Sequence, residues 1–171
     1  MPFGGGTPGK PGAAGDVTAD LVFGQGAGKT FNTGFCNGSS GFVLSALTLC
    51  GPAGLSVDPF GTLFVADTLN NRVLAYNESA NPPTNVTSQL EFGQGTTGID
   101  FTHNGVNAGG LSANSLNLTG NEDGVANNLN GDLYVADSGN RRLLLYYGGF
   151  LAAPTPTPTR TPTSTPTPKA L

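Results

Sequence analysis

Apolar residues along the chain come in short runs, each bounded by glycine, proline, asparagine or aspartate. The run Leu63 to Ala66 is rich in strand-forming residues and too short for a helix, so it predicts a buried strand. A polar turn follows over residues 67–71, and apolar positions resume over 72–76. Upstream, residues 54–58 supply a further predicted strand, which is closed by the turn Asp58-Pro59-Phe60-Gly61. The pattern therefore predicts three antiparallel strands.

This pattern occurs twice. Residues 61–72 (GTLFVADTLNNR) recur as residues 131–142 (GDLYVADSGNRR), which places the two copies 70 residues apart. A fourth strand is predicted over residues 89–94 (QLEFGQ), and it has an earlier copy over residues 20–25 (DLVFGQ). In chain order, the sequence thus predicts first a single strand of the fourth type, over residues 20–25. A complete set of four strands follows, and then a final set of the first three, over residues 124–147. Repeated four-stranded antiparallel sheets cannot bury their faces alone, and radial stacking in a β-propeller solves this.

Residues 51–76 and 124–147 resemble the NHL repeat of β-propellers, whose signature is an apolar strand ending in V-A-D and a turn leading to N-x-R. The F-G-Q strand is similar to the companion strand of bacterial NHL proteins. The resemblance implies an all-β chain with two NHL-like blades, each a four-stranded antiparallel sheet. The repeat of 70 residues is longer than ordinary blades of about 40 to 50 residues. The repeated polar residues are expected to hydrogen-bond in the turns and between blades: Asp67, Asn70, Arg72, Asp137, Asn140 and Arg142.

Propellers need about four to eight blades, so two blades cannot close a ring. We therefore expect the propeller to be completed by oligomerisation, in which the leading strand of one copy adds to the open edge of the last set of another. Such a head-to-tail contact gives a ring if the rotation closes and a filament if it does not. The residues expected to exchange are Asp20, Leu21, Val22, Phe23, Gly24 and Gln25.

Composition divides the chain into three parts. Residues 1–18 are a glycine- and proline-rich linker, residues 19–150 the two-blade domain, and residues 151–171 a proline- and threonine-rich spacer. The 27 glycines and 13 prolines suit a turn-rich all-β chain. A net charge of −4 argues against a nucleic-acid partner. Residues 1–15 lack the apolar region of a signal peptide, and no run approaches the ~20 apolar residues of a membrane span.

Cys36 and Cys50 are the only cysteines, and a disulfide between them is expected, with two buried free thiols as the alternative. The bridge would place the protein outside the cell or on its surface. Four sequons make Asn37, Asn77, Asn85 and Asn117 candidates for N-glycosylation. The Pro/Thr tract suits O-glycosylation, with these candidate sites: Thr155, Thr157, Thr159, Thr161, Thr163, Thr165 and Thr167.

Candidate catalytic chemistry is sparse. His103 is the single histidine and lies in a Gly/Asn-rich stretch, which argues against a histidine metal site and a Ser-His-Asp triad. The glycine-rich residues 24–30 depart from the P-loop pattern, so no cofactor is expected. A calcium site stays open, with Asp16, Asp20, Glu122 and Asp123 as possible ligands but no D-x-[DN]-x-[DN]-G loop.

The expected function is an extracellular, non-enzymatic structural or adhesive protein whose main partners are copies of itself. One alternative is a carbohydrate-binding propeller, in which tyrosines such as Tyr134 and Tyr146 contact glycans. A second alternative is a fragment of a larger NHL-propeller enzyme, although this chain lacks the metal-binding histidines that NHL lyases use.

Overall fold

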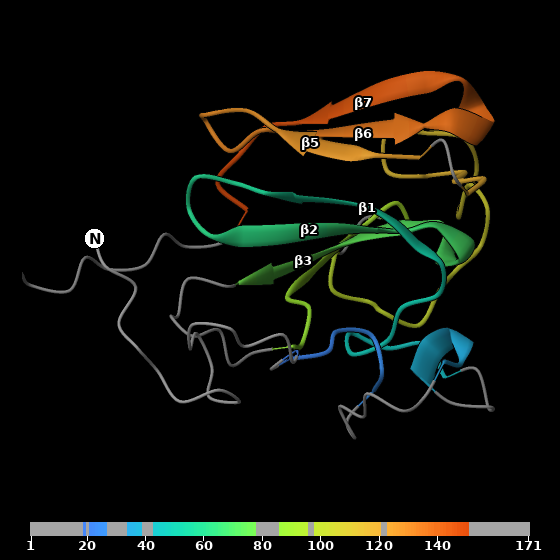
Figure 1. Ribbon diagram of the computed structural model, residues 1–171. Coiled ribbons are helices and arrows are strands. Elements are labelled where there is room, and N and C mark those ends of the chain that lie inside the picture. Colours follow the sequence, from blue (N-terminus) through green and yellow to red (C-terminus); the bar gives the residue numbers. More distant parts are fainter. Residues whose placement is uncertain are drawn as a thin grey trace, which may run out of the picture.

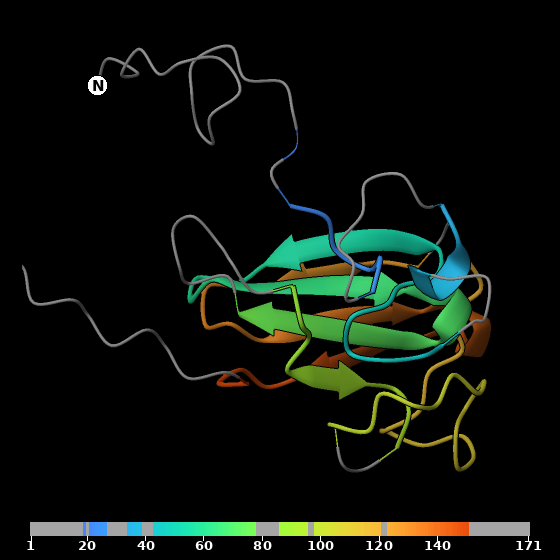
Figure 2. The ribbon, with the colours of Figure 1, turned by 90° about the horizontal axis from the view of Figure 1, so that it is seen from below.

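The computed structural model describes residues 19, 21–26, 34–38, 43–77, 86–95, 98–120 and 123–150. This part of the chain is all-β, with two antiparallel sheets of four and three strands joined by irregular segments and single turns of 3-10 helix. The sheets lie one above the other (Figure 1), and seen from below the strands of the second sheet lie behind those of the first (Figure 2). The all-β fold and its antiparallel pairing are therefore confirmed.

The first sheet has the order β1-β2-β3-β4. Its strands are β1 (Pro52–Val57), β2 (Thr62–Asp67), β3 (Arg72–Asn77) and β4 (Leu90–Phe92), close to the predicted ranges. The predicted turn after β1 is held by Asp58, whose Oδ1 accepts hydrogen bonds from the backbone N–H of Phe60 at 2.9 Å and of Thr62 at 2.8 Å.

The second sheet repeats the first three strands, as predicted. It contains β5 (Val125–Asn127), β6 (Leu133–Asp137) and β7 (Arg142–Tyr146), in that order. A 3-10 turn joins the second strand to the third in each sheet, η2 (Thr68–Asn70) between β2 and β3 and η3 (Ser138–Asn140) between β6 and β7. Both turns are followed by a residue in the left-handed region, Asn71 with φ 53° and Arg141 with φ 54°.

The main core lies between the two sheets. Phe64, Val73 and Ala75 of the first sheet pack against Leu133 and Val135 of the second, and all five are fully buried. Strands β1 and β5 come closest: a Cβ on Gly54 would lie 3.1 Å from Cα of Gly124, its counterpart in the second repeat. The absence of a side chain at residue 54 therefore lets the two backbones meet.

A second cluster covers the other face of the first sheet. It contains Leu49, Val65, Leu74 and Tyr76, with Phe23 packed against it. The ring of Phe23 meets Tyr76 edge-on, with 5.2 Å between ring centroids. Both faces of the first sheet are thus covered.

The strand predicted over residues 20–25 is not formed. Asp20 lies outside the described residues, and within 21–25 the pairing is limited to an isolated bridge from Gln25 to Thr48. The physical reason is the lack of a partner, since the later copy of this segment, β4, becomes a strand by pairing with β3. The bridge itself is repeated, because Gln94 after β4 bridges Ser115 in the same way.

Candidate functional site

The same buried polar cluster occurs in both sheets. The carboxylate of Asp67 accepts hydrogen bonds from the backbone N–H of Cys50 at 2.6 Å, from Nδ2 of Asn70 at 2.8 Å and from Nε of Arg72 at 2.8 Å. Asp137 in the second sheet has the equivalent donors, with the distances given in parentheses: Asn117 N (2.8 Å), Asn140 Nδ2 (2.9 Å) and Arg142 Nε (2.6 Å). The six residues predicted from the repeat therefore meet in two matching clusters.

Each cluster includes an asparagine pair in which one member, Asn37 or Asn107, lies outside the repeated motif. Asn70 donates to Asn37 Oδ1 at 2.8 Å, and Asn37 donates back at 3.4 Å. Asn140 and Asn107 repeat this pair at 2.7 and 3.0 Å. The signal was present in the sequence, because both pairs are separated by 33 residues.

Asn37, one of the predicted N-glycosylation sites, has a side chain that is 5% exposed and an amide nitrogen that donates to Asn70. A glycan on that nitrogen would have to break the buried pair. Asn77 and Asn117 are half-buried. Asn85, the seven threonines of the tail and the segments 1–18 and 151–171 lie outside the described residues.

The two arginines differ sharply in their surroundings. Arg72 is fully buried and forms a second ion pair through Nη1, 2.9 Å from Oε1 of Glu91 on β4. Its remaining contacts are with three backbone carbonyls: Phe101 (3.3 Å), Ser45 (3.2 Å) and Thr48 (2.9 Å). Arg142 has two hydrogen bonds in the described residues, Nε to Asp137 and Nη2 to the carbonyl of Ser115 at 2.6 Å, and its side chain is 25% exposed. Among the described residues, no carboxylate meets Nη1 of Arg142 as Glu91 meets Nη1 of Arg72.

Burial raises the pKa of both Asp67 and Glu91, and the adjacent Arg72 offsets part of that rise. One guanidinium serves two buried carboxyls here, so the cluster would carry an excess negative charge if both were ionised. The second sheet has one carboxyl, Asp137, beside Arg142.

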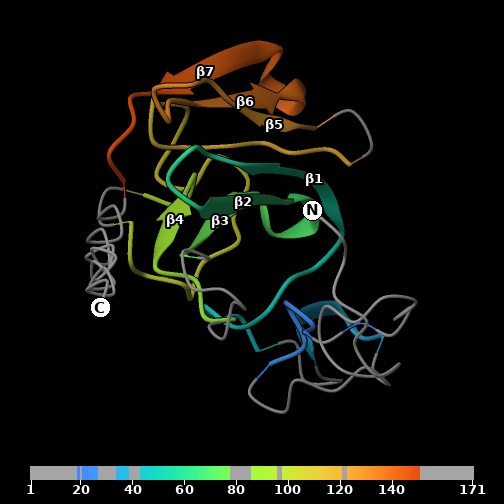
Figure 3. The same ribbon diagram turned by 60° about the vertical axis from the view of Figure 1, so that its left-hand side comes forward.

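The second sheet also has an open face and an open edge. Leu143 and Leu145 on β7 are 66% and 42% exposed, whereas their counterparts on β3, Val73 and Ala75, are fully buried. Strand β3 is covered along its edge by β4, which Figure 3 shows beside it, and among the described residues no strand pairs with the equivalent edge of β7. We call the unpaired edge of β7, which begins at Arg142, the open edge, and Leu143 and Leu145 point to the outer face beside it.

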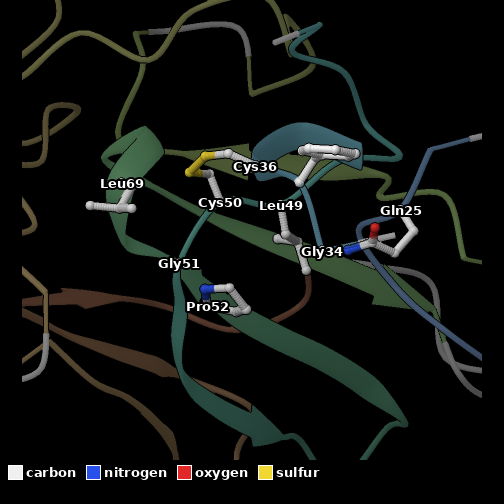
Figure 4. A pocket seen from close by; sticks show the side chains of 9 residues that line it. Gln25, Gly34, Cys36, Leu49, Cys50, Gly51, Pro52 and Leu69 are labelled. Carbon is white, nitrogen blue, oxygen red and sulfur yellow. A yellow bond between two sulfur atoms is a disulfide. The ribbon is translucent and has the colours of Figure 1, made fainter. Parts of the chain in front are cut away.

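Cys36 and Cys50 form the predicted disulfide. Beside it lies a pocket of about 300 Å³ lined by Gln25, Gly34, Phe35, Cys36, Leu49, Cys50, Gly51, Pro52 and Leu69 (Figure 4). None of these side chains is an acid or a base, so the pocket offers apolar contact, backbone groups and the side-chain amide of Gln25.

The tyrosines proposed for glycan contact are in different settings. The ring of Tyr146 packs edge-on against Phe92, with centroids 5.0 Å apart, and burial raises its pKa to about 12. Tyr134 is half-buried on the outer face of β6. Tyr146 is therefore engaged in the core between the sheets.

The remaining candidate residues do not form a reactive group. His103 is exposed, with Nδ1 3.3 Å from the Asp100 carboxylate. Asp123 is buried and accepts from Ser138 Oγ at 2.5 Å and from the N–H of Gly120 at 2.7 Å, while Asp16, Asp20 and Glu122 lie outside the described residues. Within the described ranges, no group of three or more His, Cys, Asp or Glu residues could hold a metal ion.

Among the residues that the structure places, no helix has the length and apolar character needed to cross a membrane. No family model matches the chain, and no curated protein matches it. The likeness to NHL repeats therefore rests on the two sequence motifs described above.

Proposed function

We propose that this chain is an extracellular, non-enzymatic assembly protein whose two sheets are NHL-like propeller blades, completed by copies of itself. The observation that carries the proposal is the difference between two equivalent strands. Strand β3 has a neighbouring strand and buried apolar residues, whereas β7 has an open edge with Leu143 and Leu145 exposed. A sheet edge of this kind is a template for pairing with another chain.

The position of the leading segment supports a head-to-tail contact. Phe92 at the end of β4 packs edge-on against Tyr146 of the second sheet, and Phe23 packs edge-on against Tyr76 of the first. The bridges of Gln94 and Gln25 are equivalent as well. Phe23 thus lies against the first sheet as Phe92 of β4 lies against the second, and the β7 strand of another copy could pair with residues 21–23 as β3 pairs with β4.

Burial of the outer face of β7 supplies a driving force, because Leu143 and Leu145 point away from the core that holds Leu144 and Tyr146, and the sheet of another copy stacked on this face would cover them. Complete burial of a leucine side chain contributes about 1.5–3 kcal/mol, and Leu143 and Leu145 both have area to bury. The disulfide supports an oxidising, extracellular setting.

Sedimentation analysis of the intact chain over a range of concentrations tests the proposal, and we expect oligomers larger than a dimer. Leu143→Lys with Leu145→Lys, or removal of residues 20–25, should give monomers. Leu129→Lys is the matched control, because Leu129 is 90% exposed in the turn before β6 and should leave assembly unchanged. A wild-type chain that stays monomeric at every concentration would refute self-assembly. Glycan binding that is lost when Tyr134 is changed would instead favour the carbohydrate-binding alternative.

A further inference from the structure

The first sheet contains a template for what the open edge can bind. Strand β4 pairs with β3 in the register Phe92 opposite Val73, Glu91 opposite Leu74 and Leu90 opposite Ala75. In that register Glu91 meets Nη1 of Arg72 at 2.9 Å. The equivalent positions on β7 are Leu143, Leu144 and Leu145, and Arg142 takes the place of Arg72.

Arg142 therefore presents an unused donor at a defined point of the edge. Its Nη1 makes no hydrogen bond in the described residues, and its carboxylate partner Asp137 is bound through Nε. A strand that brings a carboxylate opposite Leu144 would supply the ion pair that Glu91 supplies in the first sheet. Pairing of an arginine with a carboxylate is stronger than a neutral hydrogen bond.

The template also specifies the residues that follow the acid. After Phe92 and Gly93 comes Gln94, whose Nε2 donates to the carbonyls of Asn71 at 2.7 Å and of Asn70 at 3.3 Å. Arg141 and Asn140 are the equivalent residues beside the open edge. Gly93 adopts φ 101°, which favours glycine at this point of the bound segment.

We propose that the open edge is a binding site for an extended peptide segment with the pattern apolar-Glu-Phe-Gly-Gln, and that Arg142 selects the glutamate. This inference rests on the proposed function, because both use the open edge, but the preferred segment here carries a glutamate that residues 20–25 lack. The chain's own leading segment has Val22 where the template has Glu91, so it fits the apolar positions and the Gly-Gln pair without satisfying Arg142.

A fluorescent peptide of residues 87–95 provides the test, with binding to the intact chain followed by anisotropy. Its Glu91→Val form should bind roughly 10- to 100-fold more weakly, the range for losing a hydrogen bond to a charged group. In the Arg142→Gln chain the two peptides should bind equally. Arg141→Asn is the control, because it removes a neighbouring charge, keeps the backbone carbonyl that the bound glutamine would use, and introduces the residue found at Asn71 in the same left-handed position. Discrimination between the two peptides should persist in this variant.

A second measurement uses the chain alone and remains valid if Arg142→Gln fails to fold. Val22→Glu should strengthen self-assembly by a similar factor, and Val22→Gln should not. Equal binding of the Glu and Val peptides to the wild-type chain would overturn the inference, as would discrimination that persists in Arg142→Gln. If the chain assembles but binds no peptide, the selection by Arg142 is wrong while self-assembly stands. If it neither assembles nor binds, both proposals fail.

Discussion

Replacing the two equivalent arginines by methionine compares a complete cluster with an incomplete one inside the same molecule. Arg72→Met leaves the side chains of Asp67 and Glu91, 0% and 3% exposed, without a cation. Removing one partner of a buried ion pair typically costs about 3–5 kcal/mol. Three backbone carbonyls also lose their donor. We therefore expect Arg72→Met to lower the free energy of unfolding by an amount at the upper end of that range.

Arg142→Met removes fewer interactions than Arg72→Met. Asp137 keeps its hydrogen bonds from Asn117 and Asn140, and the arginine side chain is already 25% exposed. Loss of a hydrogen bond to a charged group costs about 1.5–3 kcal/mol. Because domains of this kind have a total stability of about 5–15 kcal/mol, the first variant should be close to unfolding and the second should not.

Urea unfolding followed by circular dichroism, with the disulfide intact, measures both losses from the midpoint and slope. The wild-type slope should be retained in Arg142→Met. Equal losses in the two variants, or a larger loss in Arg142→Met, would refute the idea that Glu91 and the three carbonyls make the first cluster the stronger one.

Three further predictions concern other features. Replacing both Cys36 and Cys50 by alanine should lower the free energy of unfolding by about 3 kcal/mol, the chain-entropy value for a loop of about 15 residues; an unchanged urea midpoint would show that the bridge does not constrain the unfolded chain. Gly93→Ala should lower the free energy of unfolding more than Gly95→Ala. Both residues have positive φ, but a Cβ on Gly93 would lie 2.5 Å from buried Leu116, whereas a Cβ on Gly95 would meet nothing within 4 Å. Thermal unfolding of the two variants tests this order. Burial raises the pKa of Glu91 above 4.5, so its contribution to stability is complete below that pH and is lost as the pH rises through the folded-state value. Glu91→Gln should therefore flatten the decline in unfolding free energy as the pH rises above 4.5, and an unaltered pH profile would count against this assignment.

Local patterns predicted the strands well. The runs around Val65 and Val135 and the turn at Asp58 are specified by residues close in sequence, and the cysteine spacing was sufficient for the disulfide. The repeat also identified Asp67 and Arg72 as partners, because both recur at the same separation in the second copy.

Contacts that depend on a neighbour were harder to predict. Glu91 stands in a strand with apolar residues on both sides, so it resembles a solvent-facing charge until β4 is placed beside Arg72. Among the described residues, Arg142 has no acid equivalent to Glu91, so the repeat did not indicate that Glu91 pairs with Arg72. The segment 20–25 has the composition of β4, but composition does not make a strand when no edge is available to pair with it.

The two repeats are joined in a way that affects how the molecule unfolds. Strand β4 belongs to the first sheet, yet Gln94, two residues after it, bridges Ser115 in the segment that leads to the second sheet. Asn71 of the first sheet accepts a hydrogen bond from the backbone of Leu118 at 3.0 Å. In linear repeat arrays the stability is a sum of unit terms and interface terms, and here the interface term includes pairings that neither unit can make alone. Partly unfolded forms that retain a single sheet should therefore be sparsely populated, so that loss of the first sheet and loss of the second occur in one cooperative transition.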